Sequence, residues 1–219
     1  MIENGTFTFL KKLAKNNDRE WFQANKKLYD DAQANMVEFA GKLLGEISQF
    51  DEAVYGLDPR KCVFRIYRDV RFSKDKSPYK INLSLYIAPG GRKPVEPGYY
   101  FHVQPGASFI AGGKHSPDSP ELLKIRNAIV RDRDEFVKIV ETKEFKRRFG
   151  ELRGERLKTV PKGFDADDPA IEYLKLKSFT AVTDVSDDKF LTSPEFLKHA
   201  AETARAIHPL NVFLRKALA

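Results

Sequence analysis

The first quarter of the chain shows the apolar spacing of three and four residues that is typical of amphipathic helices. From Asp18 to Ile47, large apolar side chains recur at this spacing. Asp18 stands just before this run and has a side chain suited to the N-cap position. The pattern predicts N-terminal helices over residues 6–49, including one long and possibly broken helix after Asp18.

In the centre of the chain the apolar residues recur at every second position, which is typical of β-strands. A Gln-Pro-Gly turn at 104–106 separates the last two of these segments, and the other connections are also short. Consecutive strands with short connections pair antiparallel. The sequence therefore predicts an antiparallel sheet within residues 61–113, with strands in the segments 62–69, 81–87, 99–103 and 107–113.

Helical spacing returns in the last part of the chain, over residues 117–217. Ser193 and Pro194 are expected to begin a final helix, and Pro209 to end or kink it. Residues 170–185 fit a short helix or a strand equally well. The prediction is one α+β domain over residues 1–219, in which a sheet of about four or more strands packs against N-terminal and C-terminal helices.

Alternation within the predicted strands separates an apolar face from a polar one. Phe64, Ile66, Ile81 and Leu83 belong to the apolar set, which would pack against the helices. Side chains of one parity gather on one surface of a sheet. We therefore expect an opposite, polar face that presents Arg65, Tyr67, Asp69, Asn82, Ser84, Tyr86, Tyr100, His102 and Gln104.

Charge is unevenly distributed along the chain, and this changes the expected ligand. The formal net charge is +7, and residues 61–80 alone hold seven Lys or Arg against two Asp. A diffuse nucleic-acid interface usually spreads its charge along a face or a helix. A focused cluster is better suited to a localised anion.

The remaining composition is that of an ordinary globular protein, 42% hydrophobic and 32% charged. The only cysteine, Cys62, leaves no partner for an internal disulfide and fits a reducing compartment. The first residues do not have the pattern of a signal peptide, and no segment approaches the roughly 18 apolar residues of a membrane helix. We expect a cytoplasmic protein without a membrane partner.

The candidate chemistry lies in the segment RIYRDVRFSKDKSPYK, residues 65–80. Arginine binds phosphate or carboxylate through two parallel hydrogen bonds, whereas tyrosine and asparagine orient a ligand through neutral ones. The predicted ligand-binding residues are therefore Arg65, Arg68, Arg71, Lys76, Tyr79 and Asn82.

Two further residues are candidates for proton transfer, Asp69 and His102, if the protein is an enzyme. Phosphoryl transfer or phosphoester hydrolysis would be the natural reaction class beside so many cations. The four histidines lack metal-ligand spacing, so the sequence predicts no metal site, and it indicates no particular cofactor. His102 also fits a hydrogen-bonded sheet histidine, and Tyr79 a packing anchor.

The segment 65–80 resembles the signature of an uncharacterised, mainly bacterial family, domain of unknown function 2461. Segments around 16–29, 97–106 and 160–169 also look like parts of that family, in the same order. The resemblance implies a family member along nearly the whole chain, and it implies no particular ligand or activity. The residues that carry the central motif are Arg65, Arg68, Asp69, Arg71, Phe72, Asp75, Lys76, Pro78 and Tyr79.

Three functions remain open at this point. The favoured one is binding of a small phosphate- or carboxylate-bearing molecule on the polar sheet face, with or without catalysis. Nucleic-acid binding is the second, because aromatic and basic residues share the predicted strands. The third is a structural or partner-binding module in which the Arg/Asp motif only fixes a loop.

Overall fold

The computed structural model describes residues 1–91 and 96–219, which adopt the predicted α+β fold. In the N-terminal part, the Asp18 side chain accepts a hydrogen bond from the Trp21 amide, 2.8 Å away, and so caps the second helix as predicted. The helices expected over residues 6–49 are α1 (Asn4–Lys15), α2 (Arg19–Ala24) and α3 (Lys26–Ile47), and the last two form the broken helix expected after Asp18. A 3-10 turn η1 (Glu52–Val54) and the short helix α4 (Pro59–Cys62) lead to the sheet.

The sheet is antiparallel throughout and has the strand order β1-β2-β3-β4. Its strands are β1 (Leu83–Ile87), β2 (Gly98–Val103), β3 (Ser108–Lys114) and β4 (Phe179–Val185). The last strand lies outside the segment 61–113 in which the sheet was expected. It resolves the ambiguous stretch 170–185, because a short helix α8 (Ile171–Leu174) is followed there by β4.

The strand expected at 62–69 does not form, and the expected alternation of buried residues is broken at its start. Cys62 ends α4, and Cys62 and Val63 are both buried. Val63 makes a single bridge to Leu85, after which the chain leaves the sheet. Phe64 consequently turns away from the core face that its parity predicted, and Ile81, expected on the same apolar face, is 38% exposed.

The long helix α10 covers one face of the sheet. It packs so closely on β3 that a Cβ atom added at Gly112 would lie 2.4 Å from the Ile207 side chain. Pro209 was expected to end or kink this helix, but α10 continues through it, with Pro209 and the residue four before it, Arg205, both exposed. Water can therefore bond the carbonyl group that proline leaves without an amide partner. The C-terminal helices are α5 (Ser119–Arg131), α6 (Arg133–Val140), α7 (Lys143–Phe149), α9 (Asp188–Leu191) and α10 (Glu195–Leu218).

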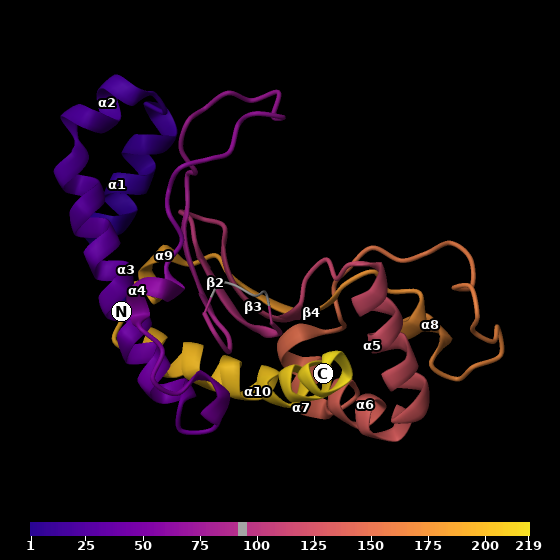
Figure 1. Ribbon diagram of the computed structural model, residues 1–219. Helices are drawn as coiled ribbons and strands as arrows, with labels where there is room; N and C mark the ends of the chain where they lie inside the picture. Colours follow the sequence, from indigo (N-terminus) through magenta and orange to yellow (C-terminus); the bar gives the residue numbers. More distant parts are fainter. Residues whose placement is uncertain (92–95) are drawn as a thin grey trace.

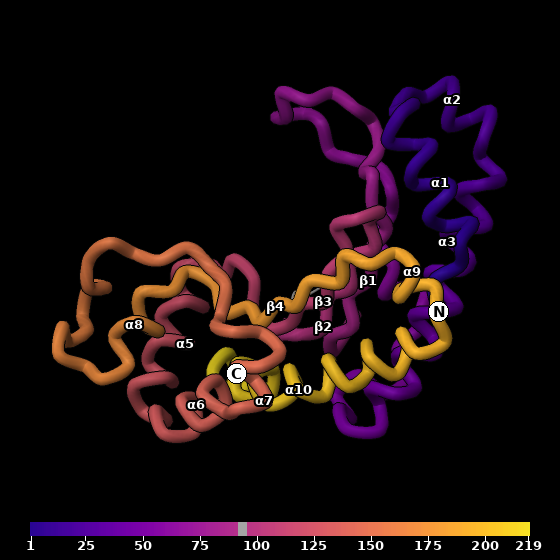
Figure 2. The backbone as a smooth tube through the Cα atoms, turned by 180° about the vertical axis from the view of Figure 1, so that it is seen from behind, coloured from indigo at the N-terminus to yellow at the C-terminus, as the bar shows by residue number. Residues whose placement is uncertain are grey.

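The helices surround the sheet on three sides (Figure 1). Helices α1–α3 rise beside its β1 edge, and α5, α6 and α8 lie beyond β4. Helix α10 runs underneath with α7 beside it, and Figure 2 shows the same arrangement from behind. The sheet face opposite α10 is left between these two walls. Within the described residues, none of the helices has the length and apolar character needed to cross a membrane.

Candidate ligand-binding site

The strand register brings the predicted polar side chains of β1 and β2 to one face. Ser84 pairs with His102, and Tyr86 pairs with Tyr100. The same face continues through Phe109, which pairs with His102. Since directly paired residues lie on the same side of a sheet, these side chains share the surface opposite α10.

A cleft of about 1160 Å³ lies over this face. Its floor over β3 and β4 is made of small side chains, because Ala111 pairs with Val182 and Gly113 with Thr180. Larger side chains of β1, β2 and the segments beyond α7 form its walls. The full lining is Phe64, Tyr86, Tyr100, Phe109, Ala111, Gly112, Gly113, His115, Ser116, Pro117, Arg153, Gly154, Glu155, Lys177, Ser178, Thr180, Val182 and Asp184.

Aromatic rings line the side of the cleft nearer β1. The Tyr100 ring lies 6.2 Å from Phe64 and 5.7 Å from Phe109, measured between ring centroids. All three rings are partly exposed. Burial raises the pKa of Tyr100, and likewise that of Tyr86, whose hydroxyl donates to the Glu96 carbonyl. Both phenols are therefore neutral at pH 7 and act as hydrogen-bonding groups.

Two ion pairs lie on the opposite wall. Arg153 lies 2.8 Å from Asp184, and Lys177 lies 3.0 Å from Glu155, with all four side chains substantially exposed. Exposed pairs of this kind contribute little to stability. Their cations can therefore exchange a carboxylate of the protein for an anionic ligand at small cost.

A second, smaller hollow of about 380 Å³ adjoins the cleft over β1. It shares Phe64 and Tyr100 with the cleft, and its remaining lining is polar. The additional lining residues are Arg68, Asp69, Lys80, Asn82 and Ser84. Three of them, Arg68, Asp69 and Asn82, were predicted from the sequence as site residues. This hollow is called the polar pocket below.

Residues 65–80 form a loop, called the arm below, that projects from the sheet beside α1–α3 (Figures 1 and 2). At its base the Lys80 amide donates to the Ile66 carbonyl at 2.8 Å. Tyr79 is buried and stacks on Phe22, with 4.0 Å between the ring centroids. Asn17 accepts from the Tyr79 amide and donates to its carbonyl, so Tyr79 anchors the arm to the N-terminal helices.

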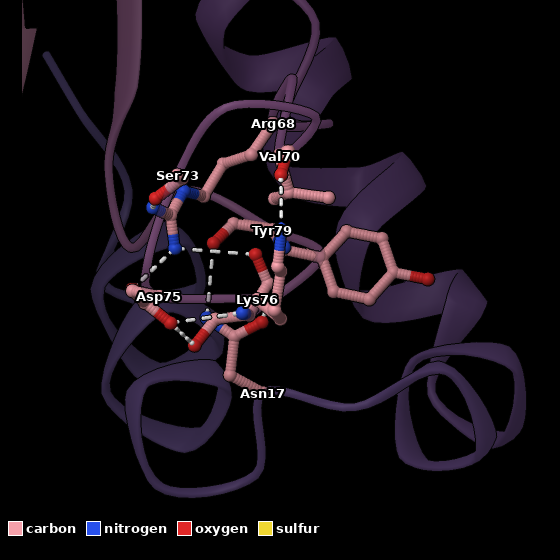
Figure 3. A network of polar contacts seen from close by, with 8 residues as sticks. Asn17, Arg68, Val70, Ser73, Asp75, Lys76 and Tyr79 are labelled. Carbon is pink, nitrogen blue, oxygen red and sulfur yellow. Dashed lines mark hydrogen bonds and ion pairs between the residues drawn. The ribbon is translucent and has the colours of Figure 1, made fainter.

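Arg68 holds the two sides of the arm together (Figure 3). Its guanidinium pairs with Asp75 and donates to the Ser77 carbonyl at 3.2 Å and to the Ser73 hydroxyl at 3.3 Å. Hydrogen bonds from Ser77, together with Arg68, lower the pKa of Asp75 to about 2. The ion pair therefore persists over the whole physiological pH range.

The other predicted arm residues do not line either hollow in the described part of the chain. Arg71 pairs with Asp69 at 2.7 Å, and this contact lowers the pKa of the Asp69 carboxyl. The Lys76 ammonium donates to the Val70 carbonyl at 3.0 Å. Arg65 is exposed. The structure thus brings Arg68, Asp69 and Asn82 together but leaves Arg65, Arg71, Lys76 and Tyr79 outside the two linings.

His102 shares the sheet face but is enclosed by its own neighbours. Its Nδ1 atom lies 3.2 Å from the Tyr100 hydroxyl, and its Nε2 atom lies 3.1 Å from Gln104 Oε1. The ring stacks on Phe109, with centroids 4.6 Å apart. Burial lowers the pKa of His102. The imidazole is thus neutral at pH 7, with both nitrogens engaged by neighbouring side chains.

A comparison with models of known protein families shows to which family the chain belongs. The model of the conserved hypothetical protein family DUF2461 matches residues 5–213. The chain belongs to this family. Neither the comparison with curated proteins nor that with solved structures gave a match. The same family was expected from the resemblance of residues 65–80. Family membership assigns no chemistry to the cleft or the polar pocket.

The sequence reasoning missed the half of the DUF2461 cleft that lies over β4 and the segments beside it. Thr180, Val182 and Asp184 alternate with buried Phe179 and Ala181, which is a strand signal within the stretch that fitted either structure. No comparable local signal marks the residues around Arg153 and His115. Among residues 1–91 and 96–219, no group of three or more His, Cys, Asp or Glu side chains is placed to hold a metal ion.

Proposed function

We propose that this DUF2461 protein binds a small organic anion on the open face of its sheet. The observation that carries the proposal is the position of the two hollows side by side, because Phe64 and Tyr100 line both the polar pocket and the larger cleft. Ligand sites typically combine a mainly apolar, aromatic cavity with a few convergent polar groups. The combined site has this composition.

The two hollows favour a ligand with two chemically different ends. Arg68, Lys80 and Asn82 supply donors to a phosphate or carboxylate in the polar pocket. Tyr100, Phe109 and the small side chains of β3 and β4 provide a surface for a flat or apolar body in the cleft. The proposal is one of binding, because the nitrogens of His102 are occupied and Asp69 is paired with Arg71.

The test compares two lysines of the arm that each donate to one backbone carbonyl. Lys80 lines the polar pocket, whereas Lys76 does not. Wild-type protein is screened by thermal shift against nucleoside monophosphates, phosphorylated sugars and aromatic carboxylates, and hits are measured by calorimetry. We expect Lys80→Ala and Asn82→Ala to weaken binding roughly ten-fold or more, because charge-assisted and pocket hydrogen bonds are lost.

Lys76→Ala is the matched control, since it removes the same charge from the same arm, and it should bind like the wild type. The proposal is rejected if no anion in the panel stabilises the wild-type protein. It is also rejected if Lys76→Ala and Lys80→Ala weaken binding equally, since that result indicates general attraction to the basic arm rather than a pocket.

A further inference from the structure

The tip of the arm exposes an aromatic side chain among cations. Phe72 is 95% exposed, and the Arg71 guanidinium lies 5.8 Å from the centroid of its ring. Lys74 and Lys76 are exposed on the same tip. An apolar ring held in water contributes almost nothing to folding, and its face is accessible for contact with a partner.

The arm presents this tip on a fixed base. The base is held by the Tyr79 stack on Phe22 and by the Asn17 hydrogen bonds to the Tyr79 backbone. Arg68 joins the two sides of the loop above it (Figure 3). None of these contacts involves Phe72. The arm is therefore built to hold Phe72 outward, and a preordered surface loses less entropy when it binds a partner.

The charge of the arm selects an anionic partner. Residues 65–80 hold six Lys or Arg and two Asp. Each of the two carboxylates, Asp69 and Asp75, is already paired with an arginine of the arm. The exposed cations at the tip therefore face solvent with a local positive excess, which attracts a polyanion.

We propose that the arm binds single-stranded nucleic acid. Phe72 offers a stacking surface for an unpaired base, while Arg71, Lys74 and Lys76 contact neighbouring phosphates; this combination of rings and cations is the usual basis of sequence-tolerant strand binding. A flexible strand can also follow the arm toward its base, where Arg68 and Lys80 line the concave polar pocket. A flat lipid bilayer cannot enter such a hollow.

The tip of the arm is separate from the small-ligand site, because neither Phe72 nor Lys74 lines the cleft or the polar pocket. Substitutions at the tip therefore test the strand proposal without altering the proposed anion site. Both side chains are exposed, so replacing them should leave folding intact.

The experiment measures fluorescence anisotropy of a labelled oligothymidylate of about ten nucleotides, within the range of single-strand site sizes. We expect Phe72→Ala to weaken binding roughly ten-fold, because one stacked base is lost. Lys74→Glu should weaken binding as well, and the slope of log K against log salt should become shallower by about 0.7 for each phosphate contact removed.

Tyr55→Ala and Lys198→Glu are the matched controls. Tyr55 is an 82% exposed aromatic residue after η1, and Lys198 is an exposed lysine on α10, on the other side of the sheet. Both variants should bind like the wild type. The proposal is overturned if the oligonucleotide does not bind at low salt, or if the tip variants bind as well as the controls. Equal affinity for a duplex of the same length, or binding only to anionic phosphatidylserine vesicles, would also overturn it.

Discussion

Arg68 and Arg71 lie three residues apart in the arm, but they make contacts of different kinds. The Arg68 side chain is 25% exposed and joins Asp75, Ser77 and Ser73 across the loop. Arg71 is 76% exposed, and its ion pair is with Asp69, two residues away. A contact across a loop restrains the chain, whereas an exposed local pair does little. The same residue type in one motif therefore has a structural role at one position and faces solvent at the other.

Replacing each arginine by alanine should separate these roles. We expect Arg68→Ala to lower Tm by roughly 2–8 °C, because a partly buried guanidinium with three partners is lost. Arg71→Ala should leave Tm within about 1 °C of the wild type. Differential scanning calorimetry of the two variants measures both values. Equal shifts would mean that the cross-loop contacts of Arg68 contribute no more than the exposed pair.

At the scale of secondary structure, the sequence predicted elements with a clear period and a local stop signal. Asp18 marked the start of α2, and alternation over 83–87 and 99–103 located β1 and β2 with the correct faces, whereas Ile81 before β1 is exposed. The failures have long-range causes. The segment 62–69 alternates but is held by one bridge to β1, and α10 continues through Pro209 because its exposed side can be hydrated. Neither cause can be recognised from a short stretch of sequence.

Within the candidate site the same limit applies. Arg68, Asp69 and Asn82 were predicted from one local motif and from strand parity, and the structure places them around one pocket. Arg153 and Asp184 are 31 residues apart, and the pairing of β4 with β3 together with the bridge between Arg153 and Thr180 brings this pair to the cleft. Local patterns thus identify the polar pocket, while tertiary structure alone supplies the far wall of the cleft.

The contact between α10 and β3 gives a prediction at this scale. Gly112→Ala should lower the free energy of unfolding by roughly 1–3 kcal/mol, because the new methyl group would meet Ile207 at 2.4 Å and the Gly98 carbonyl at 2.8 Å. Urea denaturation measures this change. Gly45→Ala on α3 is the control: its added carbon meets nothing within 4 Å, and it should be neutral or slightly stabilising.

Across the whole molecule, a buried ion pair joins the end of the N-terminal part to the C-terminal helix. Arg215 of α10 pairs with Asp51 at 2.7 Å, and the Tyr99 hydroxyl of β2 donates to the same carboxylate at 2.8 Å. Burial by itself would raise the pKa of Asp51, but contacts with His208, Arg215 and Tyr99 outweigh burial and hold that pKa well below its usual range. The carboxylate therefore stays charged down to strongly acidic pH.

Replacing Asp51 tests this connection. Asp51→Asn should reduce the free energy of unfolding at pH 7 by about 3–5 kcal/mol, because Arg215 loses its buried partner. Since the pKa of Asp51 is depressed on folding, its stabilisation is present above the unfolded value of about 3.9 and is lost as the pH falls below it.

Urea titrations at several pH values between neutral and about pH 3 measure both effects. The wild type should lose stability below about pH 4, and the Asp51→Asn variant should lose less over the same interval. Asp30→Asn, which disrupts an exposed pair with Lys26 on α3, serves as the control and should follow the wild type. An unchanged acid profile in Asp51→Asn would show that this carboxylate does not contribute to the pH dependence.

The position of β4 in the chain has a consequence for folding. Lys114 ends β3 and Phe179 begins β4, so the two paired strands are separated by a long segment that contains α5, α6, α7 and α8. Closing so long a loop delays the pairing of β3 with β4 relative to the local hairpins. Until it occurs, β3 is an open edge and the floor of the cleft is incomplete. A cleft ligand would therefore bind only the finished sheet, and it would increase the free energy of unfolding with the logarithm of its concentration relative to Kd.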